Sequence, residues 1–218
     1  MTDVEQQPRV RGRHRALYEF VDGRLRRLQQ PAGGTNPSIT ASLARLRQSI
    51  GTEPGSDPAI WAQTVAGMPP QFQGDDLHAT AEEHAVHAAL GLYALHQQAR
   101  GEPMHVTGVG MGRACSRLGR ATGNEVAVSR RFHALATASS LQEALHHARG
   151  LIGQLRAQSI PLDYALFAVD VARLQYPGLA DRVRLAWGRD YYFKPNVESE
   201  TEKTGTDGTE TITTGEQE

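Results

Sequence analysis

The sequence predicts an all-α protein of about nine helices, on the basis of three observations. Apolar residues recur every three to four positions along most of the chain, which is the spacing of one helix face. No segment alternates apolar and polar residues as a half-buried β-strand does. Glycine and proline residues separate the periodic segments. We therefore expect a compact helical bundle, either undivided or split into two lobes that share a core.

Recognisable start signals precede several of these helices. Pro58 follows Ser-Asp and stands at a helix start, where its missing backbone N–H is harmless. Thr80 and Glu83 have the spacing of a capping box, and so do Ser140 and Glu143. In that motif, the hydroxyl and the carboxylate each accept from a backbone N–H that the helix leaves unpaired. The expected helices cover residues 9–29, 39–50, 58–66, 74–100, 109–120, 128–135, 140–156, 163–174 and 179–192.

Length and composition limit the class of protein. A chain of 218 residues can bury a sizeable core, and it contains no apolar run of the roughly twenty residues that a membrane helix needs. The N-terminus lacks the pattern of a secretory signal, so we expect a cytoplasmic protein that does not bind membranes. Cys115 is the only cysteine, which excludes an internal disulfide and a multi-cysteine zinc site. We interpret it as a small buried side chain.

The formal net charge of −1 conceals two segments of opposite charge. Residues 1–195 carry 22 basic and 17 acidic side chains, a net +5, whereas residues 196–218 carry one basic and seven acidic side chains, a net −6. The second segment is rich in Thr, Glu and Gly and has too little apolar content to offset the entropy of ordering. We expect disorder in residues 1–8, a helical domain over 9–195 and a disordered acidic tail over 196–218.

Arginine outnumbers lysine by 21 to 2, and its planar guanidinium can grip phosphate with two hydrogen bonds. A GC-rich genome would explain the ratio equally well, so the positions of the arginines matter more than their number. Arg113, Arg117 and Arg120 have the spacing i, i+4 and i+7 and should share one helix face. For any one arginine the alternative is a solvated or ion-paired surface residue. The predicted phosphate contacts are Arg113, Arg117, Arg130 and Arg131, with Arg24, Arg27, Arg120, Arg149 and Arg156 as further candidates.

Two constellations could support a metal-dependent hydrolase, but a binding or assembly role is the better interpretation. Glu83, His84 and His87 can share a helix face, although they do not form the HExxH pattern of a zinc protease. Asp163 and Asp170 stand seven apart and could act as acid and base, or have ordinary ion partners. The sequence has no phosphate-binding loop, dinucleotide fingerprint or nucleophile elbow. We therefore predict no catalytic residues, no metal and no cofactor.

The order and spacing of several short elements resemble the CasB family, the small subunit of the type I-E CRISPR interference complex called Cascade. The resemblance spans about residues 43–192. The family usually has alanine where this chain has Gly188. The elements are Ala41-Ser-Leu-Ala-Arg-Leu-Arg47, His87-Ala-Ala-Leu-Gly-Leu-Tyr93, a glycine-rich turn into Arg113, Val128-Ser-Arg-Arg-Phe132 followed by Leu135, the Leu-Arg156 pair, Ile160-Pro-Leu-Asp-Tyr164 leading to Asp170, and Trp187-Gly-Arg-Asp-Tyr-Tyr192.

The resemblance implies a non-catalytic, all-helical subunit that sits as a pair among the other Cascade subunits. Such a subunit helps to hold guide RNA and target DNA and steadies the displaced DNA strand. It contacts the nucleic-acid backbone, while guide pairing selects the sequence. The sparse aromatic content argues against a base-stacking platform of the OB-fold type. The alternative is a helical scaffold whose arginines contact protein partners and whose affinity for nucleic acid is incidental.

Overall fold

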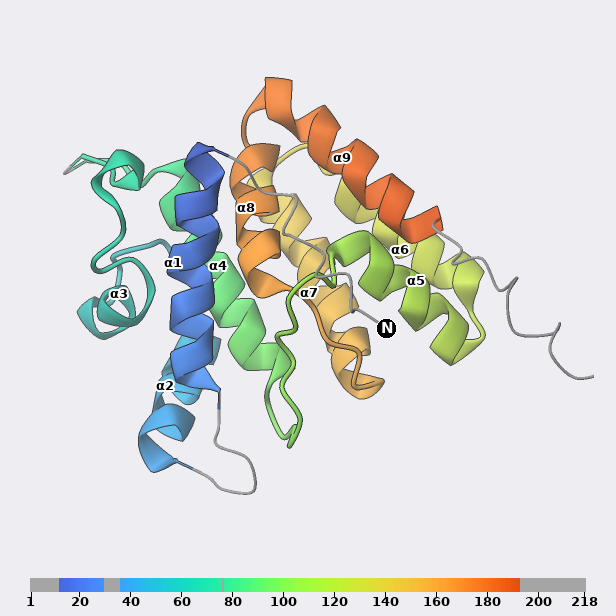
Figure 1. Cartoon of the computed structure of the whole chain (residues 1–218), viewed down its shortest axis with the longest axis horizontal. Coiled ribbons are helices and arrows are strands. Elements are labelled where there is room, and N and C mark those ends of the chain that lie inside the picture. Colours follow the sequence, from blue (N-terminus) through green and yellow to red (C-terminus); the bar gives the residue numbers. More distant parts are fainter. Residues whose placement is uncertain (1–11, 30–35, 76, 193–218) are drawn as a thin grey trace, which may run out of the picture.

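The computed structural model describes residues 12–29, 36–75 and 77–192, and this part of the chain is predominantly helical (Figure 1). It contains nine α-helices and one 3₁₀ turn, and its only β-type pairing is an isolated bridge between His105 and Leu162. The predicted all-α class is therefore confirmed. The elements are α1 (Arg13–Leu28), α2 (Pro37–Gln48), α3 (Pro58–Thr64), η1 (Pro70–Phe72), α4 (Ala81–His96), α5 (Met111–Thr122), α6 (Glu125–Ala136), α7 (Leu141–Ala157), α8 (Tyr164–Leu174) and α9 (Pro177–Tyr192).

The helices form two groups that a central pair joins (Figure 1). Helices α1 to α4 lie on one side, and α5, α6 and α9 lie on the other. Between them, α8 packs against α1, α4 and α9, while α7 packs against α4, α5 and α6. One continuous hydrophobic core contains residues from both groups. The molecule therefore has two helical groups around a shared core.

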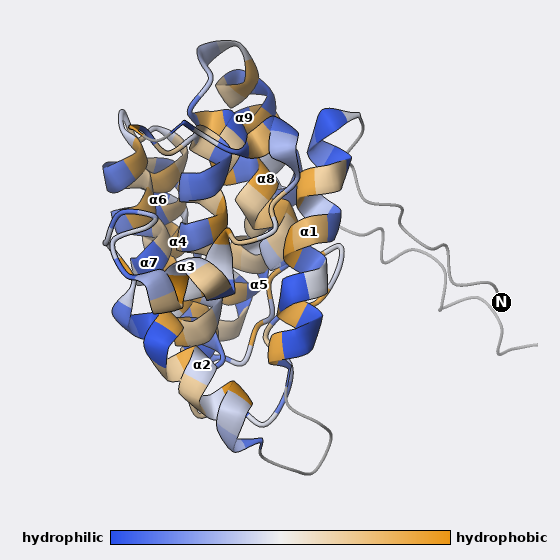
Figure 2. Cartoon of the chain, turned by 90° about the vertical axis from the view of Figure 1, so that its left-hand side faces the viewer, coloured by the Kyte–Doolittle hydropathy of each residue, from blue (hydrophilic) through white to orange (hydrophobic). Residues whose placement is uncertain are grey.

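The core forms because each helix turns an apolar stripe inward, and Figure 2 shows hydrophobic and hydrophilic residues interspersed along the helices. Leu17, Val21 and Leu25 of α1 are fully buried, as the helical spacing predicts. Trp187 of α9 and Tyr164 of α8 are among the largest fully buried side chains. Burial of one such side chain contributes about 1.5–3 kcal/mol, so these stripes account for much of the stability.

One of the two predicted capping boxes is complete. At the start of α4, the Thr80 hydroxyl accepts from the Glu83 N–H at 3.0 Å, and the Glu83 carboxylate accepts from the Thr80 N–H at 2.7 Å. At the start of α7, the Ser140 hydroxyl accepts from the Glu143 N–H at 3.2 Å. The Glu143 carboxylate, however, accepts from the N–H of Ser139, one residue earlier, at 2.7 Å. The second box therefore closes around a wider turn than the sequence predicts.

Helix α4 is shorter than the predicted segment 74–100. It ends early because Ala99 adopts a left-handed φ of 56°, which a continuing helix cannot accommodate. The buried Gln97 side chain then fixes the returning chain. Its amide donates to the carbonyls of Arg100 and Glu102 at 3.0 and 2.9 Å and accepts from the N–H of Met104 at 2.9 Å.

The following loop carries His105, whose side chain is buried. Its Nδ1 accepts from the Tyr164 N–H at 3.1 Å, and its Nε2 lies 3.2 Å from the Asp22 carboxylate of α1. A single imidazole thus joins the start of α8 to α1. The two bonds satisfy both ring nitrogens, which explains how a polar ring is tolerated in the interior.

Helices α5 and α9 approach each other backbone to backbone. A Cβ atom on Gly112 would lie 2.1 Å from the Trp187 carbonyl oxygen and 2.9 Å from the Tyr191 nitrogen. Only glycine fits there, and this contact sets the position of α5 against α9. Helix α5 then ends at Gly123, whose φ of 63° is the left-handed conformation typical of a helix terminus.

The predicted disordered segments 1–8 and 196–218 lie outside the described residues. The described helices include none with the length and apolar content that a membrane-spanning segment requires.

Candidate nucleic-acid interface

Arg113, Arg117 and Arg120 share the outer side of α5, as their spacing predicts. Arg117 and Arg120 are exposed and Arg113 is half-buried. The opposite side of the helix, which includes Cys115 and Leu118, is fully buried. The packing of that apolar side therefore forces the three guanidinium groups outward together. We call these three side chains the α5 arginine face.

The charges of the α5 arginine face act on one another. Partial burial, followed by the positive charges of Arg113 and Arg120, lowers the pKa of Arg117 from its ordinary value. Arg120 donates to the Ser116 hydroxyl at 2.8 Å, which is a neutral partner. Among the described residues, no carboxylate lies within 4.0 Å of a guanidinium nitrogen of Arg117 or Arg120. The face thus concentrates positive charge, and a bound anion would relieve the repulsion.

Arg130 and Arg131 lie on α6, the helix that follows α5 and packs against it. Both side chains are exposed, and within the described part of the chain neither has a carboxylate at ion-pair distance. Arg130 borders an open surface depression that α6 forms with Tyr191 and Tyr192 of α9. The adjacent basic pair therefore adds positive charge on the helix that packs against α5.

Arg24 and Arg27 lie on α1, in the other helical group (Figure 1). The guanidinium of the half-buried Arg24 already has hydrogen-bond partners. It donates to the Gln63 carbonyl at 2.9 Å and to the carbonyls of Ala62 and Ala66 around the end of α3. Its guanidinium also lies 4.7 Å from the centre of the Phe20 ring. Arg24 thus holds α3 against α1, whereas Arg27 is exposed and donates to the Gly23 carbonyl of its own helix at 3.1 Å.

Arg149 and Arg156 lie on α7. Arg149 is exposed and borders a cleft between α7 and α4. Arg156 donates to the Gln98 side chain at 3.0 Å and bridges α7 to the residues after α4. Burial lowers the pKa of His96 to about 4, and the positive charges of Arg100 and Arg156 act in the same direction. His96 therefore stays neutral at physiological pH.

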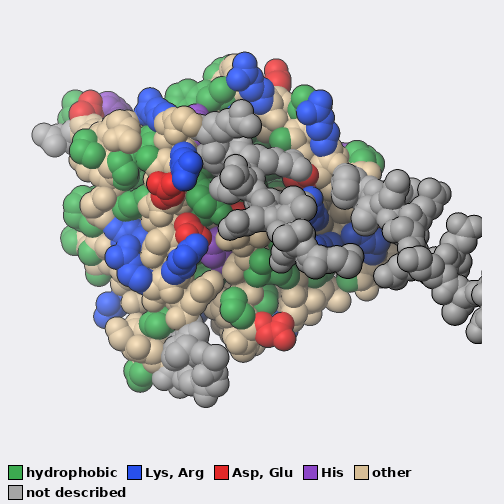
Figure 3. Space-filling model, in the orientation of Figure 1, with side chains coloured by type: hydrophobic (Ala, Val, Ile, Leu, Met, Phe, Trp, Pro, Cys, Tyr) green, Lys and Arg blue, Asp and Glu red, His purple; other side chains and the backbone are tan. Residues whose placement is uncertain are grey.

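The described basic side chains are spread over several helices. On the face shown in Figure 3, Lys and Arg side chains occur in separate groups among hydrophobic and other residues. The nine predicted arginines accordingly come from four helices, α1, α5, α6 and α7, and five of the nine lie on α5 and α6, two packed helices that are consecutive in the chain. The arginines of these two helices are therefore the best candidate for a phosphate-binding surface.

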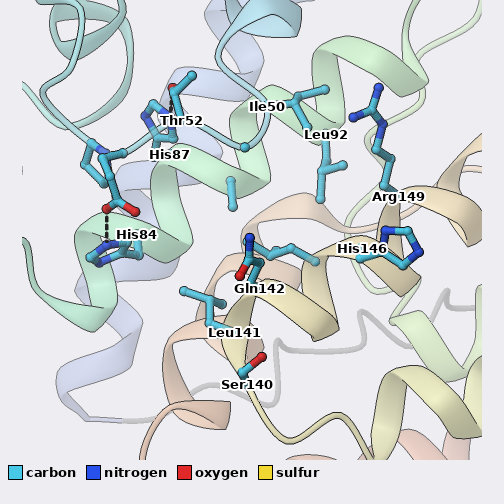
Figure 4. Close-up of a pocket in the computed structure, with 15 residues that line it drawn as sticks. Ile50, Thr52, His84, His87, Leu92, Ser140, Leu141, Gln142, His146 and Arg149 are labelled. Carbon is cyan, nitrogen blue, oxygen red and sulfur yellow. Dashed lines mark hydrogen bonds and ion pairs between the residues drawn. The ribbon is translucent and has the colours of Figure 1, made fainter.

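The histidines considered as metal ligands line a cleft of about 550 Å³ between α4, α7 and the loop after α2 (Figure 4). The imidazole ring of each histidine already has hydrogen-bond partners within the protein. His84 lies between the Thr80 carbonyl at 2.8 Å and the Glu53 carboxylate at 2.9 Å. His87 Nε2 lies 3.2 Å from the Ser49 carbonyl, and burial lowers its pKa. The described residues contain no group of three or more His, Cys, Asp or Glu side chains that could hold a metal ion.

The two aspartates considered as an acid and base pair have separate structural roles. Asp163 caps α8 by accepting from the Leu166 N–H at 2.9 Å, and its second oxygen accepts from the Gly108 N–H at 2.8 Å. Asp170 is buried and accepts from the Trp187 indole N–H at 2.7 Å. Burial raises the pKa of Asp170 to about 7. The two carboxylates thus serve a helix cap and a core hydrogen bond.

Cys115 is fully buried, as predicted, with its sulfur 3.7 Å from that of Met111. Burial raises the pKa of its thiol to about 12. A thiol with that pKa is almost entirely protonated at neutral pH and is a poor nucleophile.

Comparisons with known proteins agree with this architecture. A family model described as CRISPR-associated protein Cse2 matches residues 42–192, which is more than half of the chain. The chain belongs to the Cse2 family. The matched range begins and ends within a residue of the segment whose motifs resemble CasB, so the sequence-based recognition is confirmed.

Solved structures support the assignment to the Cse2 family. The crystal structure of CasB from Thermobifida fusca is 33% identical, with a TM-score of 0.66 over 82% of this chain and 98% of that one. The crystal structure of CasB from M. ruber is 20% identical, with a TM-score of 0.60 over 81% of this chain and 92% of that one, and it supports the fold alone. No curated protein matches the chain.

Proposed function

We propose that this Cse2 family member is a non-catalytic subunit of a Cascade-type CRISPR complex that holds nucleic-acid strands by their phosphates. It binds guide RNA and the target and displaced DNA strands without reading their sequence, beside the other Cascade subunits and a second copy of itself. The α5 arginine face carries the proposal. Three guanidinium groups share the outer side of one helix, and their mutual repulsion adds to partial burial in lowering the pKa of Arg117.

Helix stability does not explain this arrangement. Like charges at a spacing of four residues destabilise a helix by a few tenths of a kcal/mol per pair. Arg113 also lies in the first turn of α5, where positive charge opposes the helix dipole. A strand that passes across α5 and α6 would offset these costs, because each neutralised phosphate releases counterions. The surface supports affinity without sequence selection, since phosphate contacts carry no base information.

The test is a salt-dependent titration of the full chain by fluorescence anisotropy, with labelled single-stranded and duplex DNA of mixed sequence. A variant with Arg117→Glu, Arg120→Glu, Arg130→Glu and Arg131→Glu should lose binding while its helicity stays unchanged. Substituting the same arginines singly by glutamine should reduce the slope of log affinity against log salt by roughly 0.7–0.9 for each phosphate that the variant no longer neutralises. Arg113 is left intact because it is half-buried and follows Gly112, where α5 meets α9.

A matched control replaces the exposed Arg15 and Arg45, on α1 and α2, with glutamate, and it is compared with the double variant Arg117→Glu, Arg120→Glu, which changes the net charge by the same amount. The control changes the net charge in the same direction on the other helical group and should bind with a smaller loss of affinity. Equal losses in both variants would show that net charge alone governs binding and would contradict the proposed surface. If the unsubstituted chain binds neither single-stranded nor duplex DNA at low salt, the proposed nucleic-acid binding is wrong and the alternative, a helical scaffold for protein partners, is favoured.

A further inference from the structure

An open depression of about 490 Å³ lies between α6 and the last turn of α9. Helix α9 ends beside α6 on the same side of the molecule as α5 (Figure 1). The volume of the depression is in the range of small-ligand sites, roughly 300–1,000 Å³. The lining residues are Glu125, Val126, Ser129, Arg130, His133, Tyr191 and Tyr192.

The depression exposes apolar surface that a folded domain ordinarily covers. The side chains of Val126 and Tyr192 are 83% and 64% exposed. They are among the most exposed large hydrophobic residues in the described chain, and both line the same hollow. Exposed apolar residues that gather at one place indicate an interaction site more strongly than single ones do.

The Tyr192 ring is held in a fixed orientation rather than free in solvent. It packs edge-on against Tyr191 with the ring centres 5.0 Å apart, and Tyr191 stacks on Phe132 at 4.6 Å with an angle of 10° between the planes. The Tyr192 hydroxyl lies 3.3 Å from Nε2 of His133. Phe132 is buried in the core, so this column of rings anchors the exposed tyrosine. A ring ordered in advance loses little entropy when a flat partner binds.

The polar groups around the ring favour a nucleotide over other flat partners. Arg130 provides a guanidinium at the border of the depression, where it can bind a phosphate. Glu125 provides a carboxylate that can accept from the amino group of a base. Proteins that bind single-stranded nucleic acid commonly combine an aromatic ring, on which a base stacks, with a neighbouring positive charge that binds the backbone.

We propose that Tyr192 stacks on one unpaired base of a bound single strand, with the adjacent phosphate on Arg130. The inference rests on the proposed function, because it assumes that α6 faces nucleic acid. It adds a preference for single strands over duplex, since only an unpaired base can present its face to the ring. The site is one local platform, and it differs from the extended stacking surface that the aromatic content argues against.

The test compares Tyr192→Leu with Tyr192→Phe in the full chain. Tyr192→Leu should weaken binding of a short labelled single strand by roughly 5- to 100-fold, the effect of losing one stacked base. Duplex affinity and the slope of log affinity against log salt should stay unchanged, because no charge is removed. Tyr192→Phe keeps the ring and should bind as the unsubstituted chain does. Leu185→Ala, at an exposed position on the same helix, is the control for losing apolar surface.

A second readout follows the base itself. A single strand that carries 2-aminopurine should lose fluorescence on binding the unsubstituted chain and the Tyr192→Phe variant, and lose less on binding Tyr192→Leu. Equal single-strand affinity and equal quenching in Tyr192→Leu would overturn the stacking site. If charge reversal on α5 and α6 still abolishes binding in that case, the phosphate surface stands and only the stacking fails.

Two further outcomes separate the possibilities. If the unsubstituted chain binds no nucleic acid, the proposed function and this inference fall together. If Tyr192→Leu keeps its nucleic-acid affinity but no longer assembles with partner subunits, the depression is a protein contact and the inference is wrong.

Discussion

Replacing Gly112 with alanine tests the contact that positions the α5 arginine face. The new Cβ would lie 2.1 Å from the Trp187 carbonyl oxygen, 2.9 Å from Asp190 Cβ and 2.9 Å from the Tyr191 nitrogen. Close carbon–oxygen contacts in proteins are about 3.3–3.6 Å, so the helices must separate by about 1 Å at this point. Two of the three opposing atoms belong to the α9 backbone and cannot rotate away. The separation would also loosen the packing around Trp187.

The expected loss of stability follows from these distances. Overpacking a core costs about 1–3 kcal/mol and sometimes more, and here rigid backbone takes the place of adaptable side chains. The higher helix propensity of alanine returns at most about 1 kcal/mol. We expect a net loss of about 2 kcal/mol, which corresponds to a decrease in Tm of about 4–8 °C for a chain of this size.

The measurement is thermal and urea unfolding followed by circular dichroism, with Gly150→Ala as the matched control. Gly150 lies in the exposed part of α7, and a Cβ there would have no atom within 4 Å. That variant should be more stable by about 0.5–1 kcal/mol, because alanine favours a helix over glycine. If Gly112→Ala proved as stable as Gly150→Ala, the backbone contact between α5 and α9 would be refuted.

Two other substitutions test interior polar groups. Burial raises the pKa of Asp170 from 3.8 to about 7. Between pH 3.8 and pH 7 the folded state therefore keeps a proton on Asp170 that the unfolded state has lost. The free energy of unfolding falls by up to about 4 kcal/mol as pH rises through that range. In urea unfolding, Asp170→Asn should therefore gain stability relative to the unsubstituted chain as pH rises from 4 to 7, and a constant difference would show that Asp170 is charged throughout. Arg24→Met should cost about 1–2 kcal/mol, because it removes the hydrogen bonds to the end of α3. It should leave nucleic-acid affinity unchanged in the anisotropy titration. A smaller slope of log affinity against log salt would instead show that Arg24 contacts a phosphate.

The sequence alone determined the helical class, most helix positions and the family. These depend on local spacing: an apolar residue every three to four positions, a Thr80–Glu83 cap, and short motifs in a fixed order. It also placed the α5 arginines on one face correctly, because the geometry of a single helix fixes that result. Boundaries were less exact, since the early end of α4 depends on the backbone of Ala99.

Only the tertiary structure decided which polar residues are available for function. Arg24 and Arg117 look alike in the sequence, but the chain around the end of α3 lies beside Arg24 and provides three carbonyls, whereas Arg117 faces outward from α5. His105 and Asp170 likewise became interior groups because partners distant in the chain, Asp22 and Trp187, reach them. The same holds for the exposed ring of Tyr192, which depends on how α9 ends against α6. Helical spacing shows which side of its own helix a residue occupies, and the packing of the other helices determines what lies on that side.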